Sequence, residues 1–172
     1  MDPNRNPGIQ LGQIVVEGAQ FQHRSDYLAL EPQTKIGSLA LGMKLELGLS
    51  PDKRQGLIRL SLQTDRTARP LYAIEASIVA LVKVADGQEN MPLDRYAAVS
   101  GGALLMPFMR ELVANLTSRG RFGPIWLHPV NLSGVPFEES KSGALSTPSR
   151  ENSPPRKGRP AREQRRKRKE HR

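Results

Sequence analysis

The feature that most constrains the fold is a run of strict alternation between residues 39 and 49. Large apolar side chains occupy every second position there, and small or charged residues lie between them. The apolar residues are Leu39, Leu41, Met43, Leu45, Leu47 and Leu49. A period of two places all of them on one face of an extended strand, whereas a helix would distribute them around its axis. The segment therefore predicts a β-strand with one apolar and one solvated face.

A partner strand is expected directly after this one. Residues 50–52, Ser-Pro-Asp, supply a turn, because proline presets φ and aspartate can bond its own backbone. Beyond the turn, Ile58, Leu60 and Leu62 alternate with polar residues. The two segments together predict an antiparallel hairpin with one face exposed to water.

Two further strands are predicted, over residues 71–85 and 9–22. Residues 71–85 contain helix formers such as alanine and leucine, but β-branched isoleucine and valine accumulate there and favour a strand. In residues 9–22 the alternation is interrupted by Gln13 and Glu17, which indicates an edge or interface strand. The residues of that segment expected on one face are Ile9, Leu11, Val15, Ala19 and Phe21.

The pattern becomes helical after Pro92. Residues 92–99 predict a short helix that ends at the Ser-Gly-Gly sequence of residues 100–102. A longer amphipathic helix follows, with Pro107 early in it and Gly120 at the position of a C-cap. Its apolar stripe comprises Leu105, Phe108, Met109, Leu112, Val113 and Leu116. Residues 124–132 are expected to be extended.

Charge separates the last part of the chain from the rest. Residues 141–172 carry twelve Lys or Arg and three Glu, so this segment alone accounts for the formal net charge of +9. From residue 137 onward almost no large apolar side chains occur, and such a composition cannot offset the entropy of ordering. We therefore predict one α+β domain over residues 1–136 and a disordered basic tail over residues 137–172.

Several classes of protein are disfavoured by composition. The chain has no cysteine, and its three histidines show no metal-binding spacing, so no metal site or cofactor is expected. No nucleophile elbow, phosphate-binding glycine loop or dinucleotide fingerprint occurs, which predicts a protein that is not an enzyme. The polar start of the chain and the lack of a long uncharged apolar run predict a soluble cytoplasmic protein with no transmembrane segment.

Three short segments resemble the SecB family of protein-export chaperones. Residues 104–111 read LLMPFMRE, residues 118–120 read SRG and residues 129–132 read PVNL, in the order that the family shows. The resemblance implies a four-stranded antiparallel sheet packed by a long helix. It further implies dimers that join their sheets and tetramers that pack through the long helices. The function it implies is a chaperone that holds unfolded preproteins for export.

The resemblance also implies a client-binding groove along the fourth strand. The matching positions are Tyr72, Ile74, Ala76 and Ile78, with Phe21 and Phe108 as aromatic neighbours. The alternative interpretation is that these apolar side chains are ordinary core residues of a sheet beneath a helix.

Departures from the family weigh against docking of the export motor ATPase, which uses an acidic sheet surface. Glu75 matches one such acid, but Gly18 and Gln22 stand where the first strand of the family carries others. The second family helix is also broken by the sequence LSGVP at residues 132–136. A SecB-like chaperone dedicated to a toxin–antitoxin pair is therefore an alternative.

The basic tail offers a third alternative. The run at residues 165–169, RRKRK, could bind RNA, ribosomes or an anionic surface through its charge, in a salt-dependent way. No aromatic residue follows Phe137, so base stacking is unavailable. The competing interpretation is a solvated tail with no fixed partner.

Overall fold

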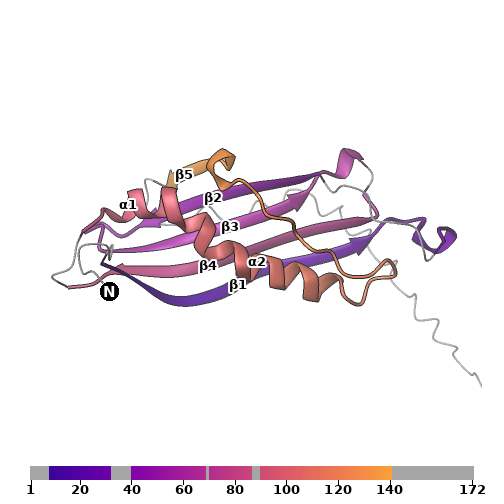
Figure 1. The fold of residues 1–172 in the computed structure, drawn as a ribbon, viewed down its shortest axis with the longest axis horizontal. Helices are drawn as coiled ribbons and strands as arrows, with labels where there is room; N and C mark the ends of the chain where they lie inside the picture. The colour runs from indigo at the N-terminus through magenta and orange to yellow at the C-terminus, as the bar shows by residue number, and fades with distance from the viewer. Residues whose placement is uncertain (1–7, 32–39, 69, 87–89, 141–172) are drawn as a thin grey trace, which may run out of the picture.

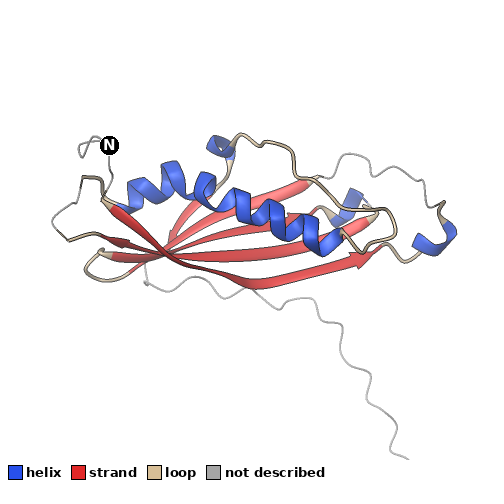
Figure 2. Cartoon of the chain, turned by 60° about the horizontal axis from the view of Figure 1, so that its bottom comes forward, coloured by secondary structure: helices blue, strands red, loops and turns tan. Residues whose placement is uncertain are grey.

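A computed structural model describes residues 8–31, 40–68, 70–86 and 90–140. They form one five-stranded sheet with a long helix across one of its faces (Figures 1 and 2). The strands are β1 (Ile9–His23), β2 (Leu41–Leu49), β3 (Gln55–Thr64), β4 (Tyr72–Val84) and β5 (Phe137–Ser140). Their order in the sheet is β1-β4-β3-β2-β5. The α+β class and the four strands predicted from the sequence are confirmed, and a fifth strand is added. Leu39, where the alternation begins, lies outside the described residues.

The hairpin of β2 and β3 follows the expected alternation. The two strands pair from Leu41 opposite Thr64 to Leu49 opposite Gly56. At the turn, the Ser50 hydroxyl donates to the Gln55 carbonyl at 2.9 Å and accepts from the Gln55 N–H at 3.0 Å. Ser50 therefore closes the turn with its side chain as well as its backbone.

Strand β4 confirms that residues 71–85 favour a strand over a helix. Alternate residues from Tyr72 to Val84 are buried beneath the helix, and most residues between them are partly exposed on the opposite face. We call the helix-covered face the inner face and the opposite one the outer face. The inner face of β2, β3 and β4 forms the floor of the core.

Strand β1 is the edge strand that the sequence predicted, and its irregular pattern has a structural cause. Its register against β4 shifts between Leu11 and Ile14 and again between Val16 and Gly18. These two bulges lie at Gln13 and Glu17, the residues that interrupt the alternation. As a result Val15 pairs with Val79 on the outer face, so its predicted place beside Phe21 is wrong.

The helical region is longer and more continuous than predicted. Helix α1 (Leu93–Tyr96) passes through a π-helical turn (Ala97–Gly101) directly into α2 (Gly102–Thr117). The predicted break at residues 100–102 is wrong. A β-carbon on Gly101 would lie 3.1 Å from a methyl carbon of Ile58, so this glycine allows close packing of the helix on β3.

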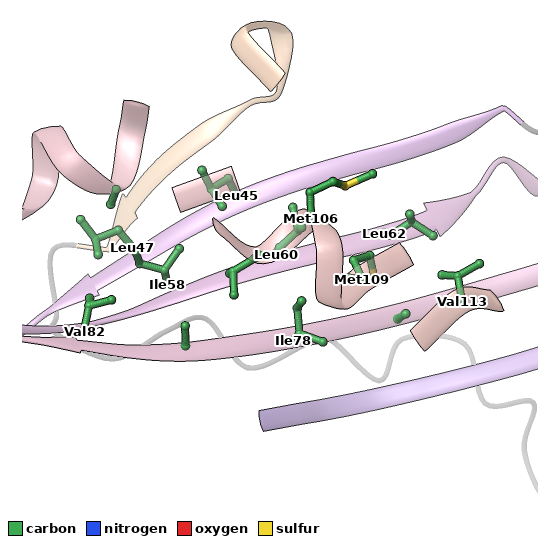
Figure 3. Close-up of a cluster of buried hydrophobic side chains, with 14 of the residues drawn as sticks. Leu45, Leu47, Ile58, Leu60, Leu62, Ile78, Val82, Met106, Met109 and Val113 are labelled. Atoms are coloured by element: carbon green, nitrogen blue, oxygen red, sulfur yellow. The ribbon is translucent and has the colours of Figure 1, made fainter. Parts of the chain in front are cut away.

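Helix α2 covers the core with one side only. Leu105, Met106, Met109 and Val113 are buried against inner-face side chains of the sheet. Figure 3 shows this packing for Met106, Met109 and Val113. Phe108 was predicted in the same apolar stripe, but it lies on the side of the helix that faces away from the sheet, and it is 43% exposed. The helix therefore leaves an aromatic residue on its solvent side.

Among the described residues, one helix, Leu93–Thr117, is long and apolar enough to cross a membrane by length and composition alone. No transmembrane segment was predicted from the sequence, in which Glu75 and Lys83 interrupt the most apolar stretch. A core helix passes the same test, and this one packs on the sheet with 44% of the tested window buried.

The segment that follows α2 returns along the helix and ends in a strand (Figure 1). Residues 124–131 are extended, and residues Leu132–Gly134 form a single 3-10 turn. Strand β5 then pairs in parallel with β2. The prediction of disorder is therefore wrong for residues 137–140. Residues 141–172, the rest of the predicted tail, lie outside the described part of the chain.

Candidate client-binding surface

The β4 residues expected to line a client groove are buried inside the subunit. Tyr72, Ile74, Ala76 and Ile78 are at most 2% exposed and form part of the core beneath α2. Figure 3 shows Ile78 in this position, close to Met109 of the helix. In the described conformation a client reaches these four side chains only if the helix or its flanking turn moves.

Phe21 and Tyr72 are brought together at one end of the sheet. Their rings lie 4.8 Å apart in an edge contact, and the His23 ring lies 5.3 Å from that of Tyr72. Tyr27 stacks on His23 at 4.4 Å, and Phe122 contacts Tyr72 at 5.7 Å. Phe21 is half-buried at the margin of this aromatic cluster, so it connects the core to the surface.

The aromatic cluster holds the turn that follows α2. The Phe122 N–H donates to the Tyr72 hydroxyl oxygen at 2.7 Å, and that hydroxyl donates to the Gly123 carbonyl at 3.2 Å. Burial raises the pKa of the Tyr72 phenol, and the bond from Phe122 opposes that rise only in part. Gly120 donates its N–H to the Thr117 carbonyl at 2.8 Å, consistent with its predicted position at the helix end.

The extended segment after this turn is anchored to the helix by polar bonds. The Ile125 N–H donates to the Thr117 hydroxyl at 2.8 Å, and Arg110 donates to the His128 carbonyl at 3.4 Å. Ile125 and Leu127 are buried, whereas Trp126 between them is 71% exposed. Trp126 and Phe108 are therefore large apolar side chains presented to solvent on the helix-bearing side.

The edge strand β1 exposes a second set of apolar side chains. On the inner face Leu11 is 42% and Val16 is 51% exposed, beyond the part that α2 covers. On the outer face Val15 and Leu81 are also exposed. Among the described residues, no strand pairs with the free edge of β1, so its backbone groups can receive another strand.

The outer face carries a chain of charged residues that crosses the sheet. Arg59 of β3 lies 2.5 Å from Glu17 of β1 and 3.3 Å from Glu46 of β2. Lys44 of β2 lies 3.2 Å from Glu46 and 2.7 Å from Glu138 of β5. Each of these acids is paired with a base of the same chain, so the face does not present free acidic charge at this place.

Glu17 has its protonation set by these neighbours. Burial alone raises the pKa of its carboxyl, but hydrogen bonds from Arg59 and from the Ser77 hydroxyl, at 2.8 Å, outweigh that effect and lower the pKa. Glu17 therefore stays ionised at neutral pH. It is also the residue that forms the second bulge of β1.

Glu75, the residue that matches a motor-docking acid, lies on the outer face. It accepts a hydrogen bond from Gln20 at 2.7 Å and lies 4.0 Å from Arg66. Its neighbours Gly18 and Gln22 add no acid to the surface. A polar hollow of about 630 Å³ lies nearby, lined in part by Gln22, Arg24 and Arg66. It includes none of the residues predicted to bind a client.

The described residues contain no group of three or more His, Cys, Asp or Glu side chains that could hold a metal ion. Their arrangement combines a sheet with one covered face, exposed apolar side chains along the helix and edge strand, and a pairable backbone edge. These features are typical of the class of proteins that bind extended polypeptide.

The comparisons with known proteins identify the family. The family model described as preprotein translocase subunit SecB matches residues 38–142, which is more than half of the chain. The chain belongs to the SecB family, a family of chaperones without enzymatic activity, so the resemblance drawn from the sequence is confirmed.

Curated relatives support the same assignment. A protein-export protein SecB of Acidithiobacillus ferrooxidans is 38% identical over 65 residues, which cover 37% of this chain and 42% of the relative. The match thus spans less than half the length of that relative. The protein-export protein SecB of Nitrobacter hamburgensis is 23% identical over 137 residues, covering 77% of this chain and 85% of the relative.

A solved structure shares the fold. It is the Mycobacterium tuberculosis Rv1957 SecB-like chaperone in complex with a ChAD peptide from the Rv1956 HigA1 antitoxin. Its TM-score is 0.55 at 20% sequence identity, and the match covers 76% of this chain and 100% of that one. At this identity the likeness concerns the fold.

Proposed function

We propose that this protein is a cytoplasmic chaperone that holds unfolded preproteins in a state competent for export. The observation that carries the proposal is the exposed apolar surface that a SecB-family subunit presents on the helix-bearing side. Burial of apolar client segments there contributes roughly 25 cal/mol per Å², with little demand on sequence. Holding a client needs no cofactor and no chemical step.

The client surface that we propose has an exposed part and a covered part. Phe108 and Trp126 are available to a client directly, and Phe21 lies at the margin of the core beside Tyr72. Tyr72, Ile74, Ala76 and Ile78 join the surface only when α2 or the turn at residues 118–123 lifts. Initial binding is therefore assigned to the exposed aromatic residues.

Assembly is proposed to use the free edge of β1. A second copy can continue the sheet there, and Leu11 and Val16 lose their solvent exposure in such a contact. The solvent side of α2 offers a second contact, which would turn a homodimer into a homotetramer and would compete with a client for Phe108. Both contacts follow from surfaces that one subunit leaves uncovered.

A second candidate is a chaperone dedicated to a toxin–antitoxin pair. Two observations favour it: the solved structure with the same fold holds an antitoxin peptide, and the outer face here pairs its acids with its own bases. The second feature weakens docking of the export motor, which requires free acidic charge. A single antitoxin segment would then replace the broad set of preproteins.

The third alternative, binding of RNA, ribosomes or an anionic surface by the basic tail, is a separate activity. Twelve Lys or Arg residues within 141–172 would give salt-sensitive binding to RNA, ribosomes or an anionic surface. That activity adds to a chaperone domain and does not replace it.

The test is whether the full chain delays refolding of a slow-folding unfolded protein at both low and moderate salt. Delay that persists as salt rises supports client holding by apolar burial, because screening affects mainly charge contacts. Delay that disappears with salt, together with salt-sensitive RNA binding, assigns the activity to the tail and contradicts the proposal. Competition by an antitoxin segment alone, with no delay of other clients, would favour the dedicated chaperone.

A further inference from the structure

The last described strand, β5, differs from the other four in direction and length. It has four residues and runs parallel to β2, whereas the remaining neighbours in the sheet are antiparallel. It pairs only with residues Leu45 to Gly48 of β2. Within the described part of the chain, residues 41–44 of β2 have no strand on that side. Strand β5 thus covers about half of the β2 edge.

Few interactions retain β5 on this edge. The Leu45 N–H donates to the Pro136 carbonyl at 3.0 Å, and Phe137 packs at the margin of the core opposite Leu45. Glu138 forms its ion pair with Lys44 at 2.7 Å while 61% of the glutamate side chain remains exposed. Ion pairs exposed to solvent contribute little, because water and salt screen them. One apolar side chain and a short ladder therefore supply most of the attachment.

The chain before β5 allows it to leave without disturbing the helix. Gly134 ends the preceding 3-10 turn, and a β-carbon added there would meet no atom within 4 Å. The polar anchors of the extended segment lie upstream, at Ile125 and His128. Detachment from Pro136 onward would therefore break the contacts of β5 and the bond from the Leu45 N–H to the Pro136 carbonyl, and would leave Val135 packed against the core.

Without β5, the β2 edge has the properties of a strand acceptor. On the side away from β3, the backbone groups from Leu45 to Gly48 lose their partners, the place of Phe137 beside Leu45 becomes an apolar seat, and Lys44 loses one of its two acidic partners. An extended peptide can pair with such an edge, where main-chain bonds give affinity and the seats give selectivity.

We propose that the β2 edge is a strand-addition site, which β5 occupies in the free chain and an extended client segment takes over. The segment runs parallel to β2, with an apolar residue in the seat of Phe137 and an acidic residue directly after it facing Lys44. The inference rests on the proposed function, because the segment belongs to a client. It adds a selective site to the broad apolar surface.

The first test fixes β5 in place. Glu46 and Glu138 are register partners on the outer face, and the chain has no cysteine, so the double substitution Glu46→Cys/Glu138→Cys provides one pair of thiols. The probe is a labelled synthetic peptide with the sequence of residues 130–140. The reduced chain should bind it, and the oxidised chain should bind at least tenfold more weakly. Equal binding by the two forms would overturn the proposal.

The reduced form is the matched control, since both forms lack the same two carboxylates. The oxidised and reduced forms are also compared in the refolding assay. If both delay the client equally, the chaperone function stands and strand addition is contradicted. If neither form nor the unmodified chain delays it, the proposed function itself fails.

The second test releases β5. Phe137→Ala removes the apolar contact, so the open fraction rises and the peptide should bind several-fold more tightly than to the unmodified chain. A peptide whose two glutamates are replaced by lysine should bind more weakly than the original. Unchanged peptide affinity in Phe137→Ala, or an assembly larger than that of the unmodified chain in place of tighter peptide binding, would overturn the proposal. The larger assembly would show that the β5 of another copy takes the edge.

Discussion

A β-carbon placed on Gly120 would lie 2.4 Å from the hydroxyl oxygen of Tyr72. That hydroxyl also receives the N–H of Phe122, so the turn after α2 is closed around the phenol of a core tyrosine. The relationship explains why a residue without a side chain is required at this place. The reason is close packing and not a left-handed backbone, since Gly120 is absent from the described residues with positive φ.

We predict that Gly120→Ala destabilises the protein by about 1–3 kcal/mol, the usual cost of overpacking a tight site. The measurement is the midpoint and slope of urea unfolding. Gly18→Ala is the matched control, because nothing lies within 4 Å of a β-carbon there, and it should change stability by less than about 0.5 kcal/mol. Equal effects of the two substitutions would contradict the steric explanation.

Tyr72→Phe should weaken the same turn by a different route. It removes the partner of the Phe122 N–H and of the Gly123 carbonyl, at an expected cost of about 1–3 kcal/mol for partly buried groups left unsatisfied. In the double variant Tyr72→Phe/Gly120→Ala, the clash with the hydroxyl is gone. The two losses should therefore sum to more than the loss in the double variant, and strict additivity in a double-mutant cycle would refute the coupling.

Phe108 and Met109 are neighbours in sequence, and substitutions at the two positions should distinguish an effect on client binding from an effect on stability. Phe108→Ser should leave urea unfolding almost unchanged and should reduce the delay of client refolding, because the side chain is exposed on the helix. Met109→Ala should lower stability by about 2–5 kcal/mol, since its side chain is fully buried. A Phe108→Ser chain that delays refolding as well as the original would remove Phe108 from the client surface.

The pH dependence of stability should depend in part on Glu17. Its pKa is lowered in the folded chain, so its stabilising contribution is present above the unfolded pKa and is lost as pH falls through the folded pKa. The free energy of unfolding in urea should therefore fall less between pH 7 and pH 3 in Glu17→Gln than in the original chain.

Ser77→Ala provides a graded comparison for this effect. It removes one of the two hydrogen bonds that lower the pKa of Glu17 and leaves the contact with Arg59 in place. Its loss of stability between pH 7 and pH 3 should lie between the losses of the original chain and of Glu17→Gln. If Glu17→Gln loses as much stability on acidification as the original chain, other carboxyl groups control the acid dependence of stability.

The sheet was largely predictable because side-chain alternation is a local signal. This signal is present within β2, from Leu41 to Leu49, and in the β-branched residues of β4, and it can be recognised from each segment alone. The bulges at Gln13 and Glu17 were visible only as interruptions, so the outward position of Val15 could not be derived. It depends on pairing with Val79, a contact between distant residues.

Two features required the tertiary structure. Gly101 and Gly102 have the composition of a helix end, yet Gly101 faces Ile58 and the helix continues through it. The sequence Phe-Glu-Glu-Ser of β5 is too short and polar to show a period, and only the exposed edge of β2 makes it a strand. The buried state of the β4 residues follows from the same continuous helix, which covers them.

The opposite positions of β1 and β5 have a practical consequence for engineering. Any segment that follows Ser140 starts at the side of the sheet remote from β1, with β4, β3 and β2 between them. A reporter domain joined directly after Ser140, in place of residues 141–172, would therefore leave the β1 backbone free to meet a neighbouring copy. A domain joined directly before Ile9 would start beside that same backbone and would obstruct it.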